Sequence, residues 1–151
     1  MRVSYTPDGD TVRAWRSVTE NGTSRMEQVR IRLAYLDAPE IGHAFSLPYA
    51  LAARAYLRRL LVLGEPITVR ILGRDVYGRL LGEVLRVRDD GNCGLRLVLG
   101  GYVALRECPL SQEAYFIAES IAKEKRLGIW RKSGPWQTPW LTRHVTDVLE
   151  G

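Results

Sequence analysis

The chain has 151 residues, 46% of them hydrophobic and 26% charged, which fits one globular domain and excludes a disordered or collagen-like polymer. Its apolar runs fall far below the ~20 residues needed to cross a bilayer, which excludes a transmembrane protein. Basic residues outnumber acidic ones by 22 to 17, and all but three of the basic residues are arginines, a balance compatible with a nucleic-acid partner and equally with a genome rich in G and C.

The first part of the chain predicts strands. Apolar and polar residues alternate within residues 2–18 and 25–36, and a turn with Asn21-Gly22 at its centre separates the two stretches. Asp8-Gly9 breaks the first stretch into two strands. The second becomes apolar at every position near its end, as expected of a strand that enters a closed core, and Pro39 ends it.

The middle of the chain predicts helices alternating with strands. A helix is expected over residues 46–62 with Ser46 as its cap, followed by strands over 67–72 and 80–87. A short helix over 95–106 then precedes a longer one over 111–126, for which Ser111 is the expected cap. Five short strands with inserted helices predict an α+β fold, a small closed β-barrel of the oligonucleotide-binding type.

The tail after residue 132 differs in composition from the rest, because Trp and Pro recur in it. It is expected either to pack over the barrel or to end in a short helix that carries Leu141, Val145 and Val148. Cys93 and Cys108 show no metal-binding spacing. We expect two free thiols, with a disulfide between them as the alternative.

Three segments place charged residues where they can carry chemistry. Asp8-Gly9-Asp10-Thr11 follows the first strand, residues 32–40 span the end of a hydrophobic strand, and residues 75–79 lie between two strands. Taken singly, each has a simple structural explanation: a tight turn, a structural ion pair and a polar hairpin turn.

Together the segments supply Asp10, Asp37 and Glu40 as oxygen donors and Arg32 and Arg79 as permanent cations. Carboxylates without Cys or His suit a hard ion such as calcium or magnesium rather than zinc. Two arginines beside such an ion suit a substrate whose transition state gathers negative charge on phosphate oxygens. Strict alternation would place Arg32 and Asp37 on opposite faces, so they meet only if the strand twists, bulges or ends between them.

The ordered set of these segments, with the ending from Ala122 to Trp130, resembles the staphylococcal nuclease (thermonuclease) family over about residues 3–132. The resemblance implies a five-stranded OB-fold barrel with three helices over residues 1–132, followed by a C-terminal extension over 133–151. It also implies a metal-dependent nuclease, a calcium-dependent phosphodiesterase that cleaves DNA and RNA at the P–O5′ bond and leaves 3′-phosphate ends. Calcium is the expected ion ahead of magnesium or manganese.

The same resemblance implies a ligand set for the calcium ion. Asp10 and Asp37 would bind it, together with the backbone carbonyl of Ala38. Glu40 would contact the ion through water, and would position or deprotonate the attacking water.

The resemblance implies substrate contacts as well. Arg32 and Arg79 would hold the scissile phosphate and stabilise its pentacovalent charge, and Tyr77 would help to bind a terminal phosphate. The chain departs from the reference nuclease at residues 106–109, where that protein has two tyrosines.

The alternative is an OB-fold module that binds nucleic acid or protein without cutting it. Retention of all five charged side chains favours the enzyme. The expected partner is nucleic acid, with single-stranded DNA and RNA favoured, no membrane, and a monomer unless the tail mediates a dimer. No secretion signal opens the chain, which leaves the compartment undecided between export as a mature form and the cytoplasm.

Overall fold

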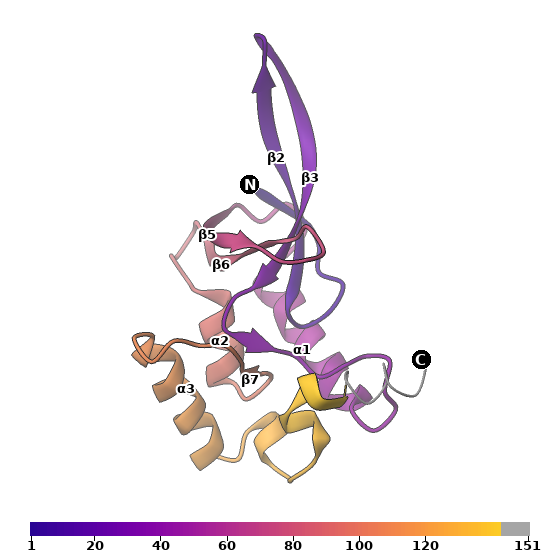
Figure 1. Cartoon of the computed structure of the whole chain (residues 1–151), viewed down its shortest axis with the longest axis vertical. Helices are drawn as coiled ribbons and strands as arrows, with labels where there is room; N and C mark the ends of the chain where they lie inside the picture. The colour runs from indigo at the N-terminus through magenta and orange to yellow at the C-terminus, as the bar shows by residue number, and fades with distance from the viewer. Residues whose placement is uncertain (143–151) are drawn as a thin grey trace.

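The computed structural model describes residues 1–142, and its centre is a five-stranded sheet in the order β1-β2-β3-β6-β5 (Figure 1). The strands are β1 (Arg2–Tyr5), β2 (Thr11–Glu20), β3 (Thr23–Leu33), β5 (Ile67–Arg74) and β6 (Leu80–Arg86). Neighbours are antiparallel except β3 and β6, which run parallel. The backbone N–H of Ile67 donates to the carbonyl of Met1 at 2.9 Å, which brings the two outer strands together and closes the barrel.

Helices and short strands cover one end of this barrel (Figure 1). The short strands β4 (Leu36–Asp37) and β7 (Ala104–Leu105) pair with each other, outside the main sheet. The helices are α1 (Leu47–Leu60), α2 (Cys93–Leu99) and α3 (Glu113–Glu124), followed by the 3₁₀ turns η1 (Gly128–Trp130) and η2 (Pro135–Gln137). Helix α2 packs against α3, α1 and β6. The α+β fold predicted from the sequence is therefore confirmed.

The core forms where the inward side chains of the strands meet α1 and α2. Strands β2 and β3 bury alternate residues, as their sequence pattern predicts, whereas β6 is buried at almost every position. The largest fully buried apolar side chains include Ile31, Leu33, Leu57, Leu97 and Val84. This packing gives the adjacent polar site a rigid support.

Strands β2 and β3 extend well beyond the barrel. They pair without interruption from Thr11 opposite Arg32 to Glu20 opposite Thr23. Strand β1 covers β2 only as far as Trp15, and β6 covers β3 only from Ile31. The rest is a two-stranded ribbon that projects from the body (Figure 1).

The ribbon ends in the turn predicted from the sequence. Asn21 and Gly22 both have positive φ, 51° and 79°. A tight hairpin turn of this kind needs two such residues in succession, and its backbone twist matches that of the strands.

Several predicted helix ends are wrong. Ser46 holds the cap position of α1 as predicted, but its buried Oγ makes no hydrogen bond within the described residues, and the helix ends at Leu60 rather than at residue 62. The short helix begins at Cys93 rather than at residue 95, since Asn92 Oδ1 accepts from the N–H of Leu95. It ends at Leu99 rather than near residue 106, because the chain turns and forms β7 at Ala104–Leu105. Helix α3 begins at Glu113, and Gln112 rather than Ser111 holds its cap position.

The described part of the tail packs on the body. Trp136 stacks on Tyr49 of α1 with ring centroids 4.7 Å apart, and the Trp140 ring lies 5.7 Å from the guanidinium of Arg106. Val145 and Val148, with the rest of the extension from residue 143, lie outside the described residues. The division into a domain and an extension stays a prediction.

The structure also bears on the two cysteines and on membrane-spanning helices. Cys93 and Cys108 are both free thiols, as expected. Among residues 1–142, no helix is both long enough and apolar enough to span a bilayer.

Candidate active site

A cavity of about 500 Å³ opens at the rim of the barrel, between the loop before β2, the end of β3, the segment after β4 and the hairpin between β5 and β6. Most of the candidate residues line it, from segments far apart in the chain: Asp10, Arg32, Ala38, Glu40, Tyr77 and Arg79. Asp37 does not line the cavity but lies fully buried behind it. The structure thus brings the candidates together, with Asp37 as a support beneath the others.

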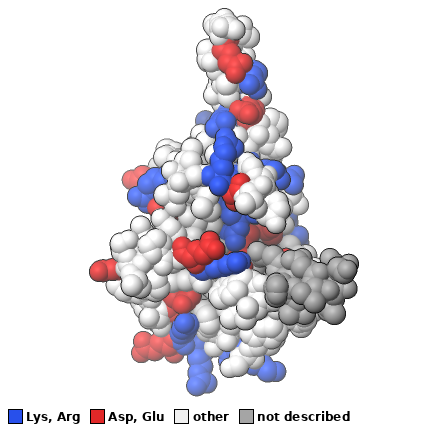
Figure 2. Space-filling view, in the orientation of Figure 1, with Lys and Arg blue, Asp and Glu red and all other residues white. Residues whose placement is uncertain are grey.

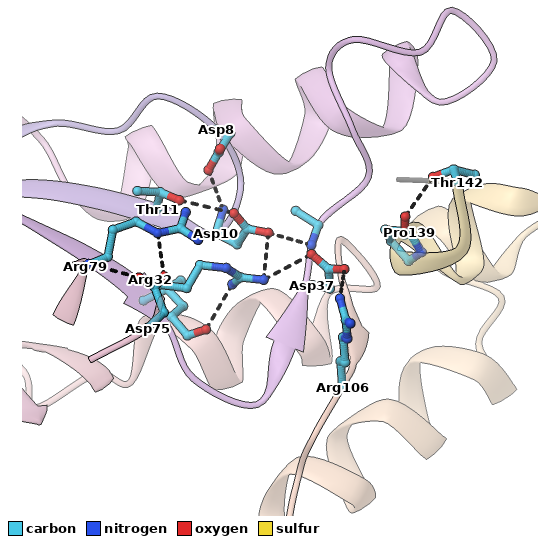
Figure 3. Close-up of polar contacts among 12 residues, drawn as sticks. Asp8, Asp10, Thr11, Arg32, Asp37, Asp75, Arg79, Arg106, Pro139 and Thr142 are labelled. Atoms are coloured by element: carbon cyan, nitrogen blue, oxygen red, sulfur yellow. Dashed lines mark hydrogen bonds and ion pairs between the residues drawn. The ribbon is translucent and has the colours of Figure 1, made fainter. Parts of the chain in front are cut away.

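Arg32 joins two carboxylates at the back of the cavity (Figure 3). Its Nη2 lies 3.0 Å from Asp37 Oδ1 and 3.4 Å from Asp10 Oδ2, and its Nη1 donates to the carbonyl of Leu33. Asp10 Oδ2 also accepts a hydrogen bond of 2.8 Å from the N–H of Ala38. Burial of these ions is tolerable because each has charged or polar partners.

Arg32 and Asp37 meet because the strand ends between them. Strand β3 stops at Leu33, and Tyr35 adopts a positive φ of 73°, which turns the chain before β4 begins at Leu36. This break overrides the alternation that would separate the two side chains. Of the three options that the sequence left open, a twist, a bulge or a strand end, the structure therefore has the strand end.

Asp37 has a second guanidinium partner, which sequence reasoning missed. Strand β7 pairs Ala104 with Asp37, so the residues that follow it pass close to the carboxylate. Arg106 Nη1 lies 3.4 Å from Asp37 Oδ2 (Figure 3). A contact between positions 69 residues apart leaves no local pattern, and only the pairing of β4 with β7 reveals it.

Arg79 is oriented by Asp75, at the other side of the cavity. Asp75 Oδ2 lies 2.6 Å from Arg79 Nε, while its Oδ1 accepts from the N–H groups of Tyr77 and Arg79. Partial burial opposes ionisation of Asp75, but these hydrogen bonds and the arginine's charge outweigh it and lower the pKa of the carboxyl. The Arg79 guanidinium lies 5.4 Å from the ring of the exposed Tyr77.

Asp8 is a further acidic residue of the cavity that the sequence did not single out for a role. Its Oδ1 accepts from the N–H of Asp10. Burial, followed by the negative charge of Asp10, raises the pKa of Asp8 to about 7. Two acids so close together make this corner of the cavity attractive to a cation.

The donor set fits a hard cation. All its side-chain donors are oxygens, and Asp10 and Asp37 already converge on one positive group, the guanidinium of Arg32. Within residues 1–142, no three side chains of Asp, Glu, His or Cys gather closely enough to hold a metal ion. A bound ion therefore needs backbone and water oxygens besides these carboxylates, which calcium accepts readily.

A second cavity, of about 640 Å³, adjoins the first and shares Arg32, Tyr77 and Arg79 with it. Arg106 and Trp140 contribute to its wall. The two cavities are neighbours through these shared residues, and the guanidinium groups of Arg32, Arg79 and Arg106 lie along their walls. Such an arrangement can hold an extended anion and stabilise negative charge that develops on it.

Comparison with known proteins gives a consistent result. The model of the family described as staphylococcal nuclease homologue matches residues 30–132, more than half of the chain. An uncharacterized endonuclease of Escherichia coli is 29% identical over 95% of this chain and 84% of its own length. The probable endonuclease LCL3 of Pyricularia oryzae is 29% identical over 93% of this chain and 60% of its own. Endonuclease YhcR of Bacillus subtilis is 32% identical over 93% of this chain but only 13% of its own length.

Proposed function

Starting from the fact that the chain belongs to the staphylococcal nuclease family, we propose that it is a calcium-dependent phosphodiesterase acting on both DNA and RNA. That the chain is a nuclease with a nucleic-acid substrate follows from the family and from relatives named endonucleases. That result favours the enzyme over the non-catalytic binding module. The proposed reaction hydrolyses the P–O5′ bond and leaves 3′-phosphate and 5′-hydroxyl ends.

The observation that carries this proposal is that Arg32 and Arg79 share one cavity with acidic side chains. Each guanidinium is anchored by a carboxylate behind it, Arg32 by Asp37 and Arg79 by Asp75. Arginines positioned in advance are suited to the planar array of phosphate oxygens and to the charge that gathers on them in the transition state. Their anchoring supports a role in positioning the scissile phosphate.

The proposed ion site uses Asp10 and the carbonyl of Ala38 at the cavity wall, Glu40 through water, and Asp37 from its buried position directly behind them. When bound, calcium neutralises phosphate charge and orients water. The support for this site is the convergence of Asp10 and Asp37 on a cationic group and the all-oxygen donor set.

Glu40 is the proposed base, since it lines the same cavity as both arginines. It takes a proton from a water whose oxygen forms a bond to phosphorus, and the P–O5′ bond breaks. The departing 5′ oxygen takes a proton from solvent and becomes a hydroxyl. Tyr77, which is exposed at the mouth of the cavity, is placed to contact a terminal phosphate.

A cleavage assay tests the proposal. Single-stranded DNA, duplex DNA and RNA are incubated with calcium, magnesium, manganese or a chelator, and the product ends are identified by enzymatic end-labelling. Cleavage with calcium, none in chelator, and products with 5′-hydroxyl ends are expected. Full activity in chelator would remove the ion from the mechanism, and 5′-phosphate products would reject the proposed bond.

A further inference from the structure

The two faces of the β2–β3 ribbon differ in charge. Side chains alternate across a strand, so every second residue of each strand shares a face. On one face, Arg16 pairs with Glu27 at 3.2 Å and Arg25 with Glu20 at 3.5 Å. The charges of this face are balanced within the ribbon itself.

The opposite face carries arginines without acids. Its residues are the odd positions 13–19 of β2 and the even positions 24–30 of β3, and no Asp or Glu occurs among them. Arg13 stands directly opposite Arg30, and Trp15 opposite Gln28. Like charges in facing positions destabilise a sheet. An anion bound between Arg13 and Arg30 would offset this repulsion.

This face is continuous with the active-site cavity. Arg32 follows Arg30 at the next position on the same face, both line the cavity, and Arg30 Nη2 donates to the carbonyl of Tyr77. Figure 2 shows basic side chains at the base of the ribbon and on the body below it, with acidic side chains among them. A chain of phosphates bound in the cavity therefore meets Arg30 and Arg13, which face each other at the base of the ribbon.

Aromatic rings alternate with these arginines. Tyr5 of β1 pairs with Arg13, whose guanidinium lies 5.6 Å from the Tyr5 ring, and Arg58 lies 5.2 Å from the same ring. Tyr5 is 46% exposed and Trp15, one step further along the face, is 42% exposed. The Nε of Arg13 has no hydrogen-bond partner within residues 1–142. Alternating cations and exposed rings are the usual components of a surface that binds single-stranded nucleic acid.

We propose that this face, named here the ribbon track and made of Tyr5, Arg13, Trp15 and Arg30, binds the single strand that flanks the scissile phosphate. The arginines contact phosphates, and the two aromatic rings stack on bases that a duplex would keep covered. This inference rests on the proposed function, because it takes the cavity as the place of cleavage.

The length of the ribbon track sets the length of strand that it binds. Gln28, opposite Trp15, lies four residues from Arg32, or roughly 13 Å at ~3.3 Å per residue. About four nucleotides cover this distance at the ~3.4 Å spacing of a stacked strand. The ribbon track therefore favours oligonucleotides over dinucleotides.

Fluorescence anisotropy in chelator tests the ribbon track without cleavage. The probes are a labelled single strand of roughly twelve nucleotides and a labelled dinucleotide. Trp15→Ala is expected to raise the Kd of the longer probe about 10-fold or more and to leave the dinucleotide unchanged. Arg13→Gln is expected to flatten the salt dependence of the longer probe by roughly 0.7 in the slope of log K against log salt.

Matched variants separate binding from folding. Arg25→Gln removes the same charge from the balanced face of the ribbon and should leave the Kd within about 2-fold of wild type. Trp15→Tyr keeps an aromatic ring and should restore most of the binding lost in Trp15→Ala, which a merely misfolded ribbon would not allow. Wild-type affinity in both Trp15→Ala and Arg13→Gln would overturn the inference. Absence of cleavage by the wild-type protein would instead reject the proposed function, and the binding result would still stand.

Discussion

The cavity and the ribbon hold their charged residues in opposite ways. Around the cavity, Asp37 is fully buried and contacts two guanidinium groups, one of them brought by a distant strand. On the ribbon, Arg16 and Glu27 face each other across adjacent strands and both are partly exposed. The first arrangement depends on the whole barrel, whereas the second depends only on the hairpin.

This difference in burial predicts which substitutions should lower stability or activity most. A buried ion that loses its partner keeps the full cost of its removal from water. An exposed ion that loses its partner is rehydrated at little cost. Four substitutions test this contrast, in descending order of expected effect.

Arg79→Ala should have the largest effect. Removal of one positioned donor to a transition-state oxyanion lowers kcat by about 10²–10³. The fold should survive, since Arg79 lies at the rim and its ion pair with Asp75 is partly exposed. Steady-state kinetics on single-stranded DNA measure the effect, with Arg25→Ala on the ribbon as the matched control. Near-normal turnover would reject the proposed role of Arg79.

Asp37→Asn should destabilise the fold by about 3 kcal/mol, because it breaks a buried pair and leaves Arg32 poorly compensated. Urea unfolding in chelator measures the loss without any contribution from a bound ion. A loss below about 1 kcal/mol would mean that water or Asp10 replaces the carboxylate, and would erase the contrast with the ribbon.

Asp75→Asn should cost about 1 kcal/mol at neutral pH, since the hairpin turn is partly exposed to solvent. The pKa of Asp75 is lowered in the folded state, so its stabilisation is present above the ordinary value of 3.8 and is lost as the pH falls through the lower folded value. Unfolding free energies between pH 2 and 7 should therefore show a shallower acid-side decline in the variant. An unchanged decline would assign the acid sensitivity to other carboxylates.

Glu27→Gln should change the unfolding free energy by about 0.5 kcal/mol or less, because its pair with Arg16 is a partly exposed surface ion pair. The same urea experiment as for Asp37→Asn gives the comparison directly. A loss similar to that of Asp37→Asn would show that the ribbon folds together with the barrel as one cooperative unit.

Local patterns in the sequence were sufficient for much of the fold. Alternation identified the strands, and Asn21-Gly22 identified the hairpin turn, because both signals lie within a few residues. Helix ends were less predictable. Asn92 displaced the expected start of α2, since a single side-chain hydrogen bond to the N–H of Leu95 decides where a helix begins.

The candidate site was predictable only as a set of residues. The chain shows Asp10, Arg32 and Arg79 but not their geometry, which depends on the end of β3 and the turn at Tyr35. Arg106 escaped notice because its link to Asp37 runs through the pairing of two short strands. Long-range pairing of this kind has no periodicity that a sequence can display.

The ribbon has one more consequence, which concerns solubility. Beyond Trp15 on one side and before Ile31 on the other, the outer edges of β2 and β3 lack a neighbouring strand among the described residues. Bare edges of this kind template sheet growth between molecules, and charged side chains such as Arg16 and Arg25 are a common defence against it. Variants that neutralise several ribbon arginines at once should therefore self-associate at high protein concentration, long before their barrels unfold.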